Sequence, residues 1–243
     1  MWNLRLGKLP TFPTKPRIAI ETGTCRGNGA RLLARHFDRV VTIELSRSLH
    51  DQACERLRAS GISNVKLLQG DSATLLPAVL DTIDPNEAVF FFLDAHWSGD
   101  STVEWSRSRW QGYGLDTAHL GQPGDTPTAH EQCPLDQELE IITRHCRGPA
   151  YVLIDDMKNI PLQGPGLKDC EFPGEDWSHL SREHLMSIVQ PRLEGLTELS
   201  EPTQWYLTLR SLSSADLVSI PAAESRRGIV GRSTELEKHG IRI

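Results

Sequence analysis

The sequence lacks several patterns that mark other classes of protein. No apolar run approaches the length of a membrane span, and residues 1–16 lack the apolar core of a signal peptide. The five cysteines include no CxxC pair, which argues against a zinc knuckle or a disulfide framework. The net charge is −6, so a broad surface for nucleic acid or anionic membrane is not expected. We therefore expect a cytoplasmic protein with free thiols that binds neither nucleic acid nor membrane.

Two common nucleotide-binding motifs are missing as well. The glycines of residues 21–30 do not have the G-x-G-x-x-G spacing of dinucleotide-binding proteins, which disfavours an NAD-dependent enzyme. They are not followed by Gly-Lys-Ser/Thr, so they do not form a Walker loop. Internal repeats are also absent.

The chain does contain a regular alternation of apolar runs and helical patterns. Its 243 residues, 38% of them hydrophobic, suffice for one large domain. Strands are predicted at 17–23, 40–46, 65–71, 88–96 and 150–157, helices at 30–37, 48–60, 72–83, 133–146 and 181–193, and a closing hairpin within 196–211. Strands that alternate with helices predict an α/β fold, a Rossmann-like three-layer αβα sandwich with a mainly parallel sheet.

Some segments fall outside this alternation. Residues 1–16 form an N-terminal arm ahead of a domain at 17–211, and residues 212–243 form a C-terminal tail of weak periodicity. Within the domain, the aromatic-rich insertion at 97–132 is typical of a lid or binding loop. The arm and the tail are the candidate interface segments if the chain assembles as a homo-oligomer.

Every predicted parallel strand carries an acid near its carboxyl end. These acids are Glu21, Glu44, Asp71, Asp94 and the pair Asp155–Asp156. Ligands of open α/β sheets bind outside the carboxyl ends of the strands. The series of acids along one edge therefore predicts a functional site there.

The first three of these acids suggest a nucleotide-like cofactor. Glu21 precedes a turn with spaced glycines between a strand and a helix, where glycine lets the backbone approach a ligand closely. Glu44 lies about 20 residues further on, where an acid can bind ribose hydroxyls. Asp71 can accept a hydrogen bond from the amino group of adenine. The alternatives are that Glu44 is a solvated acid and that Asp71 or Ser72 only caps the next helix.

The acid-x-Gly-x-x-x-Gly turn, the acid after the second strand and Asp71–Ser72 resemble class I S-adenosylmethionine-dependent methyltransferases over residues 17–210. The resemblance implies a seven-stranded sheet with an antiparallel last strand. It also implies that Glu44 binds the ribose and that Asp71 and Ser72 face the adenine. The residues implied around the methionine end of the cofactor are Glu21, Gly23, Thr24, Gly27, Asn28 and Gly29.

The last acids suggest a metal ion. Converging carboxylates of Asp94, Asp155 and Asp156 repel one another unless a cation lies between them, and Mg²⁺ is the simplest choice. The pattern resembles the metal-dependent O-methyltransferases of macrolide sugars and aminocoumarins. That resemblance implies a divalent cation that binds two oxygens of a small-molecule acceptor and acidifies the hydroxyl to be methylated.

His96 is the candidate general base beside Asp94, because residues i and i+2 of a strand share a face. The sugar methyltransferases carry Asp at this position, and the catechol-type relatives carry Lys three residues after the first Asp, where this chain has Trp97. His96 as a metal ligand or as a structural hydrogen-bonding partner remains open. An ion bound by His96 would more readily be Mn²⁺, Fe²⁺ or Zn²⁺.

Three functions are compatible with these residues. The preferred one is O-methylation of a small hydroxylated acceptor. The alternatives are a metal-dependent hydroxylase on the same fold and a non-catalytic methyltransferase-like protein that binds the nucleotide. Residues with weaker functional assignments are Trp97, Trp105, Arg107, Arg109, Trp110, Tyr113, His119, His130, Glu131, Cys133, Lys158 and Asn159.

Overall fold

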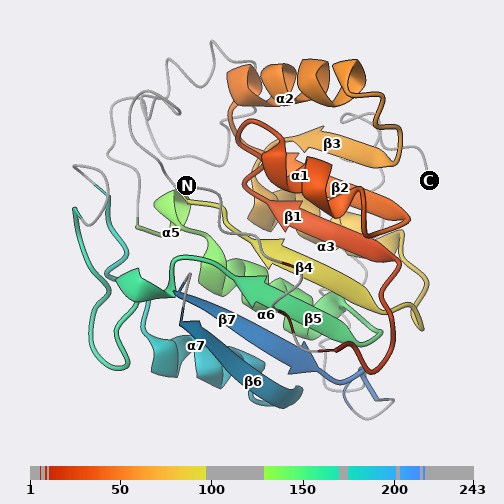
Figure 1. The fold of residues 1–243 in the computed structure, drawn as a ribbon. Helices are drawn as coiled ribbons and strands as arrows, with labels where there is room; N and C mark the ends of the chain where they lie inside the picture. Colours follow the sequence, from red (N-terminus) through yellow and green to blue (C-terminus); the bar gives the residue numbers. More distant parts are fainter. Residues whose placement is uncertain are drawn as a thin grey trace.

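A computed structural model describes residues 6, 9, 11–96, 129–169, 175–200, 203–213 and 216. Within these residues one seven-stranded sheet runs in the order β3-β2-β1-β4-β5-β7-β6 (Figure 1). Its strands are β1 (Ile18–Thr22), β2 (Arg39–Glu44), β3 (Val65–Gln69), β4 (Val89–Leu93), β5 (Ala150–Ile154), β6 (Leu193–Ser200) and β7 (Thr203–Leu209). Strands β1 to β5 pair in parallel, whereas β7 is antiparallel to both of its neighbours. The strand order reverses between β1 and β4.

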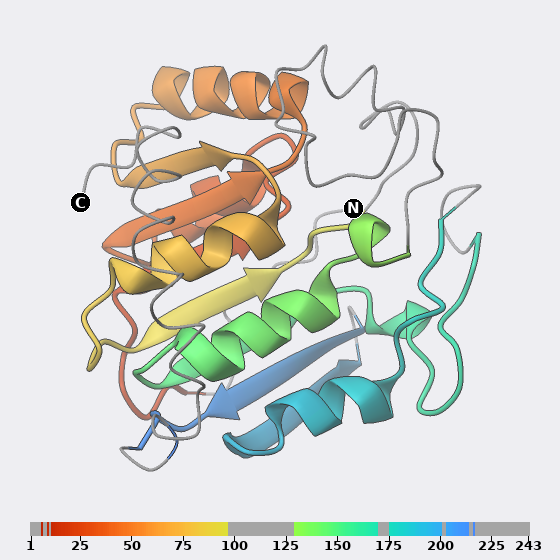
Figure 2. The same ribbon diagram turned by 180° about the vertical axis from the view of Figure 1, so that it is seen from behind.

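Helices lie on both faces of the sheet. They are α1 (Asn28–Leu33), α2 (Arg47–Ala59), α3 (Ser72–Asp81), α5 (Ala129–Gln132), α6 (Leu135–His145) and α7 (Arg182–Val189), with a 3₁₀ turn η2 (Met157–Asn159) after β5. Helices α3, α6 and α7 cover the face seen in Figure 2, and α1 packs on the opposite face. The predicted Rossmann-like sandwich with its antiparallel last strand is confirmed. None of the helices described is long and apolar enough to span a membrane.

The core consists of two layers, one on each face of the sheet, because successive side chains of a strand point to opposite faces. In β4, Phe91 belongs to the layer under α3, α6 and α7, while Phe90 and Phe92 belong to the layer on the α1 side. On that second side the N-terminal arm contributes Phe12, whose ring lies 5.0 Å from the ring of Tyr151. The predicted arm therefore covers part of the sheet where a helix does not.

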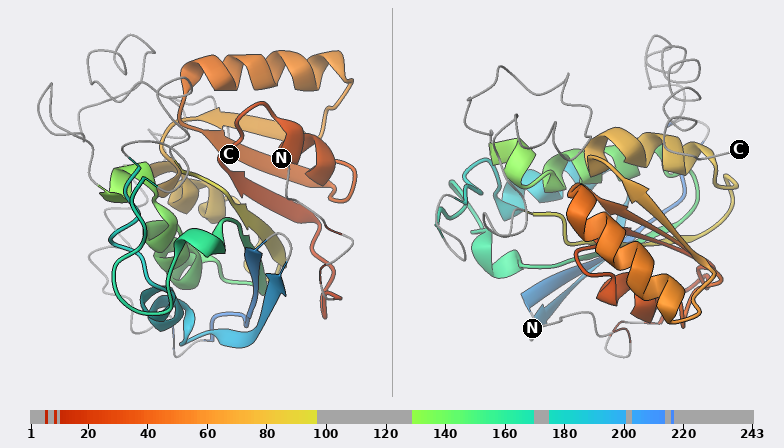
Figure 3. Two further views of the ribbon diagram at one scale, coloured as in Figure 1. Left: turned by 60° about the vertical axis from the view of Figure 1, so that its left-hand side comes forward. Right: turned by 90° about the horizontal axis from the view of Figure 1, so that it is seen from above.

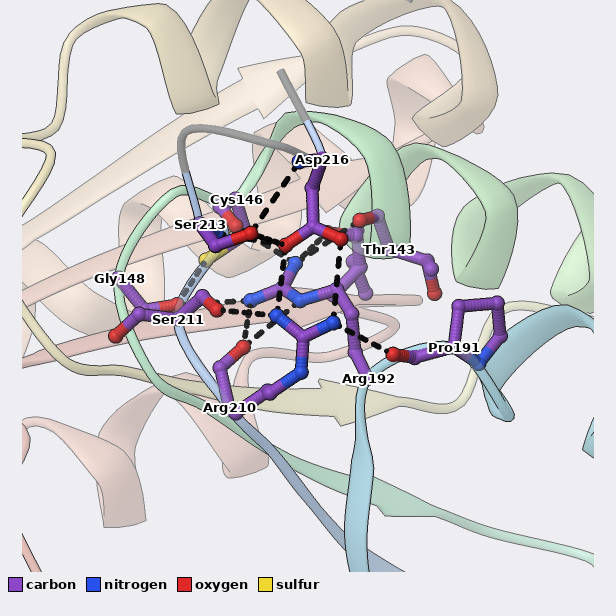
Figure 4. Close-up of polar contacts among 10 residues, drawn as sticks. Thr143, Cys146, Gly148, Pro191, Arg192, Arg210, Ser211, Ser213 and Asp216 are labelled. Atoms are coloured by element: carbon purple, nitrogen blue, oxygen red, sulfur yellow. Dashed lines mark hydrogen bonds and ion pairs between the residues drawn. The ribbon is translucent and has the colours of Figure 1, made fainter. Parts of the chain in front are cut away.

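A buried arginine joins α6 to the closing hairpin. Arg192 is 1% exposed, and its guanidinium donates to the carbonyl oxygens of Ile142, Thr143 and Cys146 at 2.7–3.0 Å. These carbonyls belong to the carboxyl end of α6, where the last four have no partner within the helix. Figure 4 shows the same guanidinium reaching Gly148 and Arg210. Arg192 thus adds donors at a buried helix end where, of these three carbonyls, Ile142 also accepts from the backbone N–H of Cys146.

The predicted elements exist, but several of their boundaries differ. Strands β3, β4 and β5 end at Gln69, Leu93 and Ile154, before the acids that the prediction placed within them. Helix α1 begins at Asn28, earlier than the predicted residue 30, because Gly27 adopts a left-handed conformation at its N-cap with φ 75°. Asp94, Asp155 and Asp156 consequently lie in the segments that leave the sheet.

The carboxyl ends of the parallel strands point to the left in Figure 1. Helix α5 and the segment that follows β5 lie beside each other at this edge, as both views of Figure 3 show. The backbone N–H of Asp176 donates to Oε1 of Gln132 at 2.8 Å, which joins the two. The predicted site residues all lie toward this edge. Most of the predicted lid (97–128) and most of the predicted tail (217–243) lie outside the described residues.

Candidate active site

The turn from β1 to α1 packs directly against the segment that leaves β4. Gly23 has φ 79°, and a Cβ atom at this position would lie 2.3 Å from the carbonyl oxygen of Asp94. A side chain at Gly23 is therefore excluded by both sterics and backbone conformation. This contact lies where the strand order reverses, which is the usual ligand crevice of an open α/β sheet.

Hydrogen bonds between buried polar groups link the turn after β1 to the neighbouring strand β2. The hydroxyl of Thr42 donates to Oε2 of Glu21 at 2.5 Å and also contacts the hydroxyl of Thr24 at 2.5 Å. Burial raises the pKa of Glu21 to about 8, and the nearby charge of Glu44 adds to this shift. The hydrogen bond from Thr42 opposes it. Glu21 therefore serves first as a buried acceptor that orients β1, β2 and the turn.

Glu44 links the glycine turn to the segment that follows β2. Its Oε2 accepts from the backbone N–H of Cys25 at 2.7 Å, and its Oε1 accepts from that of Ser46 at 2.8 Å. Burial raises the pKa of Glu44 to about 7 despite these bonds. Glu44 is 5% exposed, so the alternative of a solvated acid is wrong. Each carboxylate oxygen retains a lone pair that can accept a further hydrogen bond.

Asp71 caps α3, as the alternative reading of this residue held. Its Oδ1 accepts from the backbone N–H of Ala73 at 3.2 Å, and its Oδ2 accepts from the hydroxyl of Thr74 at 2.7 Å. Ser72 is buried and hydrogen-bonds to Glu138 on α6. The role of Asp71 and Ser72 toward an adenine stays a prediction.

Asp94, His96 and Asp156 form a compact cluster just beyond β4 and β5. Nε2 of His96 lies 3.2 Å from Oδ2 of Asp156 and 3.8 Å from Oδ1 of Asp94. One ligand atom from each residue lies within 4.8 Å of the others, a spacing that suits a metal ion. Asp94 and His96 both lie beyond the end of β4. They are therefore close for a different reason than the predicted one, which was that they share one face of a strand.

The backbone at Asp156 is held in an uncommon conformation. Its φ of 54° and ψ of 28° lie in the left-handed region, which Asp tolerates better than most residues. The side chain does not cap the 3₁₀ turn that follows it. This conformation directs the carboxylate of Asp156 to His96, and strained residues of this kind cluster at functional sites.

Asp155, the third acid predicted to bind the metal, has different partners. Its Oδ1 accepts from the backbone N–H of Asp156 at 2.9 Å, and its carboxylate hydrogen-bonds to the side chain of Gln204 on β7. The group of ligand atoms within 4.8 Å contains His96 and not Asp155. Asp155 lines the same small pocket as the cluster, where it adds negative charge beside it.

Two acids at this site were not predicted from the sequence. Glu175 is 1% exposed, and its Oε1 lies 3.5 Å from Nδ1 of His96. Glu138 is fully buried, accepts from the hydroxyl of Thr22 at 3.2 Å, and lines the same pocket. Glu138 had a detectable signal, because it is an acid within the apolar stripe of α6. Glu175 had none, because it lies in an irregular segment.

The electrostatics of the cluster follow from burial and proximity. Burial disfavours the charged form of His96, but hydrogen bonds to Asp156 and Glu175 outweigh it, and the pKa of His96 is raised well above its ordinary value. Burial also raises the pKa of Asp94 well above its ordinary value, with the charge of His96 opposing that shift. Burial would raise the pKa of Asp156, but the hydrogen bond from His96 and the charges of His96 and Lys158 together lower it.

The remaining candidate residues lie either near the cluster or outside the described part of the chain. Nζ of Lys158 lies 3.8 Å from Oδ1 of Asp156, and Asn159 is buried in the 3₁₀ turn. Cys133 is buried, and burial raises the pKa of its thiol well above the ordinary value. The predicted residues Trp97, Trp105, Arg107, Arg109, Trp110, Tyr113 and His119 lie outside the described part of the chain.

Comparison with known sequences gives a local match. No protein-family model matches the chain. A stretch of 61 residues is 41% identical to the protein-L-isoaspartate O-methyltransferase of Bradyrhizobium sp. (strain ORS 278). That stretch is 25% of this chain and 28% of the relative, so the match spans less than a third of either protein.

Comparison with solved structures gives distant neighbours. A SAM-dependent methyltransferase from Aquifex aeolicus is 16% identical with a TM-score of 0.44, over 81% of this chain and 82% of that one. The PH0226 protein from Pyrococcus horikoshii OT3 is 15% identical with a TM-score of 0.47, over 82% and 83%. An S-adenosylmethionine-dependent methyltransferase from Clostridium acetobutylicum ATCC 824 is 11% identical with a TM-score of 0.46, over 80% and 84%.

Proposed function

We propose that this chain is an S-adenosylmethionine-dependent methyltransferase that methylates an oxygen of a small hydroxylated acceptor with the assistance of a divalent cation. The observation that carries the proposal is the contact between Gly23 and the backbone of Asp94. It places the cofactor-type glycine turn immediately beside the Asp94–His96–Asp156 cluster, at the reversal of strand order. The local match to an O-methyltransferase supports the same chemistry.

The cofactor side of the site suits a nucleoside with a methionine tail. Glu44 presents a buried carboxylate whose remaining lone pairs can accept from two ribose hydroxyls. The turn at Gly23 leaves no side chain between the backbone and a ligand, and buried Thr24 and Glu21 hold it in place. Gly27, Asn28 and Gly29 open α1 beside the turn. S-adenosylmethionine, when bound, supplies an electrophilic methyl group.

The acceptor side of the site suits a divalent cation. Asp94, His96 and Asp156 would hold the ion, and the imidazole in this set favours Mn²⁺, Fe²⁺ or Zn²⁺ over the Mg²⁺ that an all-oxygen set predicts. A bound ion lowers the pKa of a coordinated hydroxyl and so makes it a better nucleophile. Asp155 lines the same pocket and would add negative charge beside such an ion.

In this proposal His96 acts as a metal ligand, and the proton acceptor is a neighbouring carboxylate. Glu175 faces Nδ1 of His96, which holds the ring with Nε2 toward Asp156 and Asp94. A carboxylate behind a histidine is the usual partner both of a metal-bound imidazole and of a general base. In the proposed reaction Asp155, the carboxylate beside the ligand set, would take the proton of the acceptor hydroxyl. The hydroxyl oxygen then forms a bond to the methyl carbon while the bond from that carbon to sulfur breaks in an in-line displacement, which leaves S-adenosylhomocysteine.

The test is calorimetric titration of S-adenosylmethionine and S-adenosylhomocysteine into metal-stripped protein. We expect binding without metal, and a loss of about 10- to 100-fold in affinity for Glu44→Gln, since a charge-assisted hydrogen bond contributes about 1.5–3 kcal/mol. Asp51→Asn is the matched control, because Asp51 is an exposed acid on α2. Equal affinity of both variants would remove Glu44 from the cofactor site.

The same titrations separate the remaining alternatives. Failure of both nucleosides to bind under any metal condition, together with iron retention and oxygen consumption, would favour the hydroxylase. Binding of the nucleoside without turnover of any hydroxylated acceptor, with Asp156→Asn disturbing only a protein complex, would favour the non-catalytic protein.

A further inference from the structure

A second group of metal-ligating side chains lies outside the site described above. His130 on α5, Asp136 in the first turn of α6, His179 before α7 and His184 on α7 converge on one carboxylate. We call this group the α5–α7 histidine cluster. These elements come from separate stretches of the chain that meet at one edge of the sheet (Figure 2).

The distances within the cluster are short. Asp136 Oδ2 lies 3.0 Å from Nδ1 of His130 and 3.8 Å from Nε2 of His184, and its Oδ1 lies 3.8 Å from Nε2 of His179. The rings of His130 and His179 lie 4.2 Å apart between centroids. One ligand atom each from His130, Asp136 and His179 lies within 4.8 Å of the others.

The hydrogen bonds within the described residues do not account for His179. Its Nε2 contacts the carbonyl oxygen of Cys133 at 3.0 Å, while its buried Nδ1 has no hydrogen-bond partner there. Buried polar atoms without partners are rare in folded proteins, and a bound ion or an ordered water is a usual explanation for them. The side chain of His179 is 10% exposed and that of Asp136 is 8% exposed, so both lie within the fold.

Solvent still reaches the cluster from one side. The side chains of His130 and His184 are each 47% exposed, so an ion can enter without unfolding the surrounding segments. Two or three imidazole nitrogens with one carboxylate oxygen suit zinc and related transition ions, whereas Mg²⁺ and Ca²⁺ prefer oxygen ligands.

We infer that His130, Asp136 and His179 form a transition-metal site that takes Zn²⁺ most simply, with His184 close to Asp136 on the exposed side of the site. The ion ties α5 and α6 to the segment before α7. That segment also carries Glu175 and Trp177, whose side chains lie against His96. The site is therefore a positioning site at the border of the candidate active site, and it does not depend on the proposed methyl transfer.

The experiment is a Zn²⁺ titration of metal-stripped protein, with the bound metal counted by elemental analysis. The double variant Asp94→Asn/Asp156→Asn removes ligands from the other cluster, so that binding in this background reports the α5–α7 histidine cluster. We expect one equivalent of Zn²⁺ and a higher melting temperature with the ion. Addition of His130→Ala to this background lowers the affinity by about 100-fold or more, since even changes behind a ligand cost 10- to 100-fold.

His36→Ala serves as the matched control, because His36 is exposed and lies at the end of the segment after α1. It leaves the affinity unchanged. If the double variant does not fold, the comparison uses the otherwise unmodified chain, where His130→Ala lowers the bound Zn²⁺ by one equivalent and His36→Ala does not. No Zn²⁺ binding in the double variant, or equal binding by the His130 and His36 variants, would overturn the inference.

Discussion

Three glutamates of the candidate site are buried, although a charged carboxylate is more stable in water. Glu21, Glu44 and Glu138 are each 5% exposed or less, and burial raises the pKa of each to about 7 or 8. A folded protein keeps such groups only if their positions serve another purpose, because burying a carboxylate costs stability. At the residue scale, function and stability therefore oppose each other here.

Glu21 makes this conflict measurable through pH. Its pKa rises from 4.5 to about 8 on folding, so between these values the folded state holds a proton that the unfolded state has lost, and stability falls as the pH rises. Glu21→Gln removes this dependence. Between pH 4.5 and pH 7 the unfolding free energy of the cofactor-free variant should therefore fall by up to roughly 3 kcal/mol less than that of the unmodified protein. Urea unfolding from pH 5 to 8 measures the difference. Parallel curves for both proteins would show that Glu21 titrates normally.

Asp156 separates charge from backbone conformation. Asn tolerates the left-handed conformation nearly as well as Asp, so Asp156→Asn should preserve the fold while removing one ligand charge. We expect metal affinity and turnover to fall by about 100-fold or more with a change in unfolding free energy below about 1 kcal/mol. Asp169→Asn is the control, because Asp169 has φ 50°. Metal binding by calorimetry and methyl transfer by product formation are the readouts, and equal losses in both variants would contradict the assignment.

At the scale of elements, α6 makes contacts at both of its ends that its sequence pattern does not predict. The helix carries Glu138 inward to the site at one end and depends on Arg192 at the other. Its predicted span of 133–146 is nearly right, but it begins at Leu135, after Pro134 as N-cap and a separate α5. Proline at that point ends the preceding turn and starts the new helix.

Loss of Arg192 should therefore weaken α6 and the closing hairpin together. Arg192→Ala removes a donor from five carbonyl oxygens, those of Ile142, Thr143, Cys146, Gly148 and Arg210. Of these, Ile142 keeps the backbone N–H of Cys146 and Gly148 keeps the thiol of Cys146. We expect a loss of about 3 kcal/mol or more in unfolding free energy. Arg144→Ala is the control on the same helix, where the side chain is 54% exposed. Thermal melts compare the two, and a similar melting temperature for both variants would show that the carbonyls find other partners.

At the scale of the whole molecule, the reversal of strand order brings distant segments into contact. The turn after β1 and the segment after β4 are about 70 residues apart in the chain, yet they touch at Gly23 and Asp94. Glu175 comes from still further along the chain and contacts Nδ1 of His96. The site exists only because the parallel sheet assembles in this order.

Gly23→Ala tests this contact. A Cβ atom there would lie 2.3 Å from the carbonyl oxygen of Asp94, in addition to the cost of φ 79°. The control is Gly61→Ala, because Gly61 has φ 66° but no atom within 4 Å of the added Cβ. We expect about 1 kcal/mol of destabilisation for Gly61→Ala and several kcal/mol for Gly23→Ala, with loss of cofactor binding only in the latter. Equal effects in denaturant unfolding would mean that the backbone conformation alone matters.

The sequence by itself determined the fold class and pointed to the edge of the sheet where the candidate site lies. The alternation of strands and helices, Gly23, Glu44 and the acids at the strand ends were all readable, because periodicity and turn chemistry are local properties. Only the tertiary structure decided that His96 joins Asp94 and Asp156 while Asp155 faces Gln204. It alone added Glu175 and the α5–α7 histidine cluster, since such groups depend on the distances between segments that are remote in the chain.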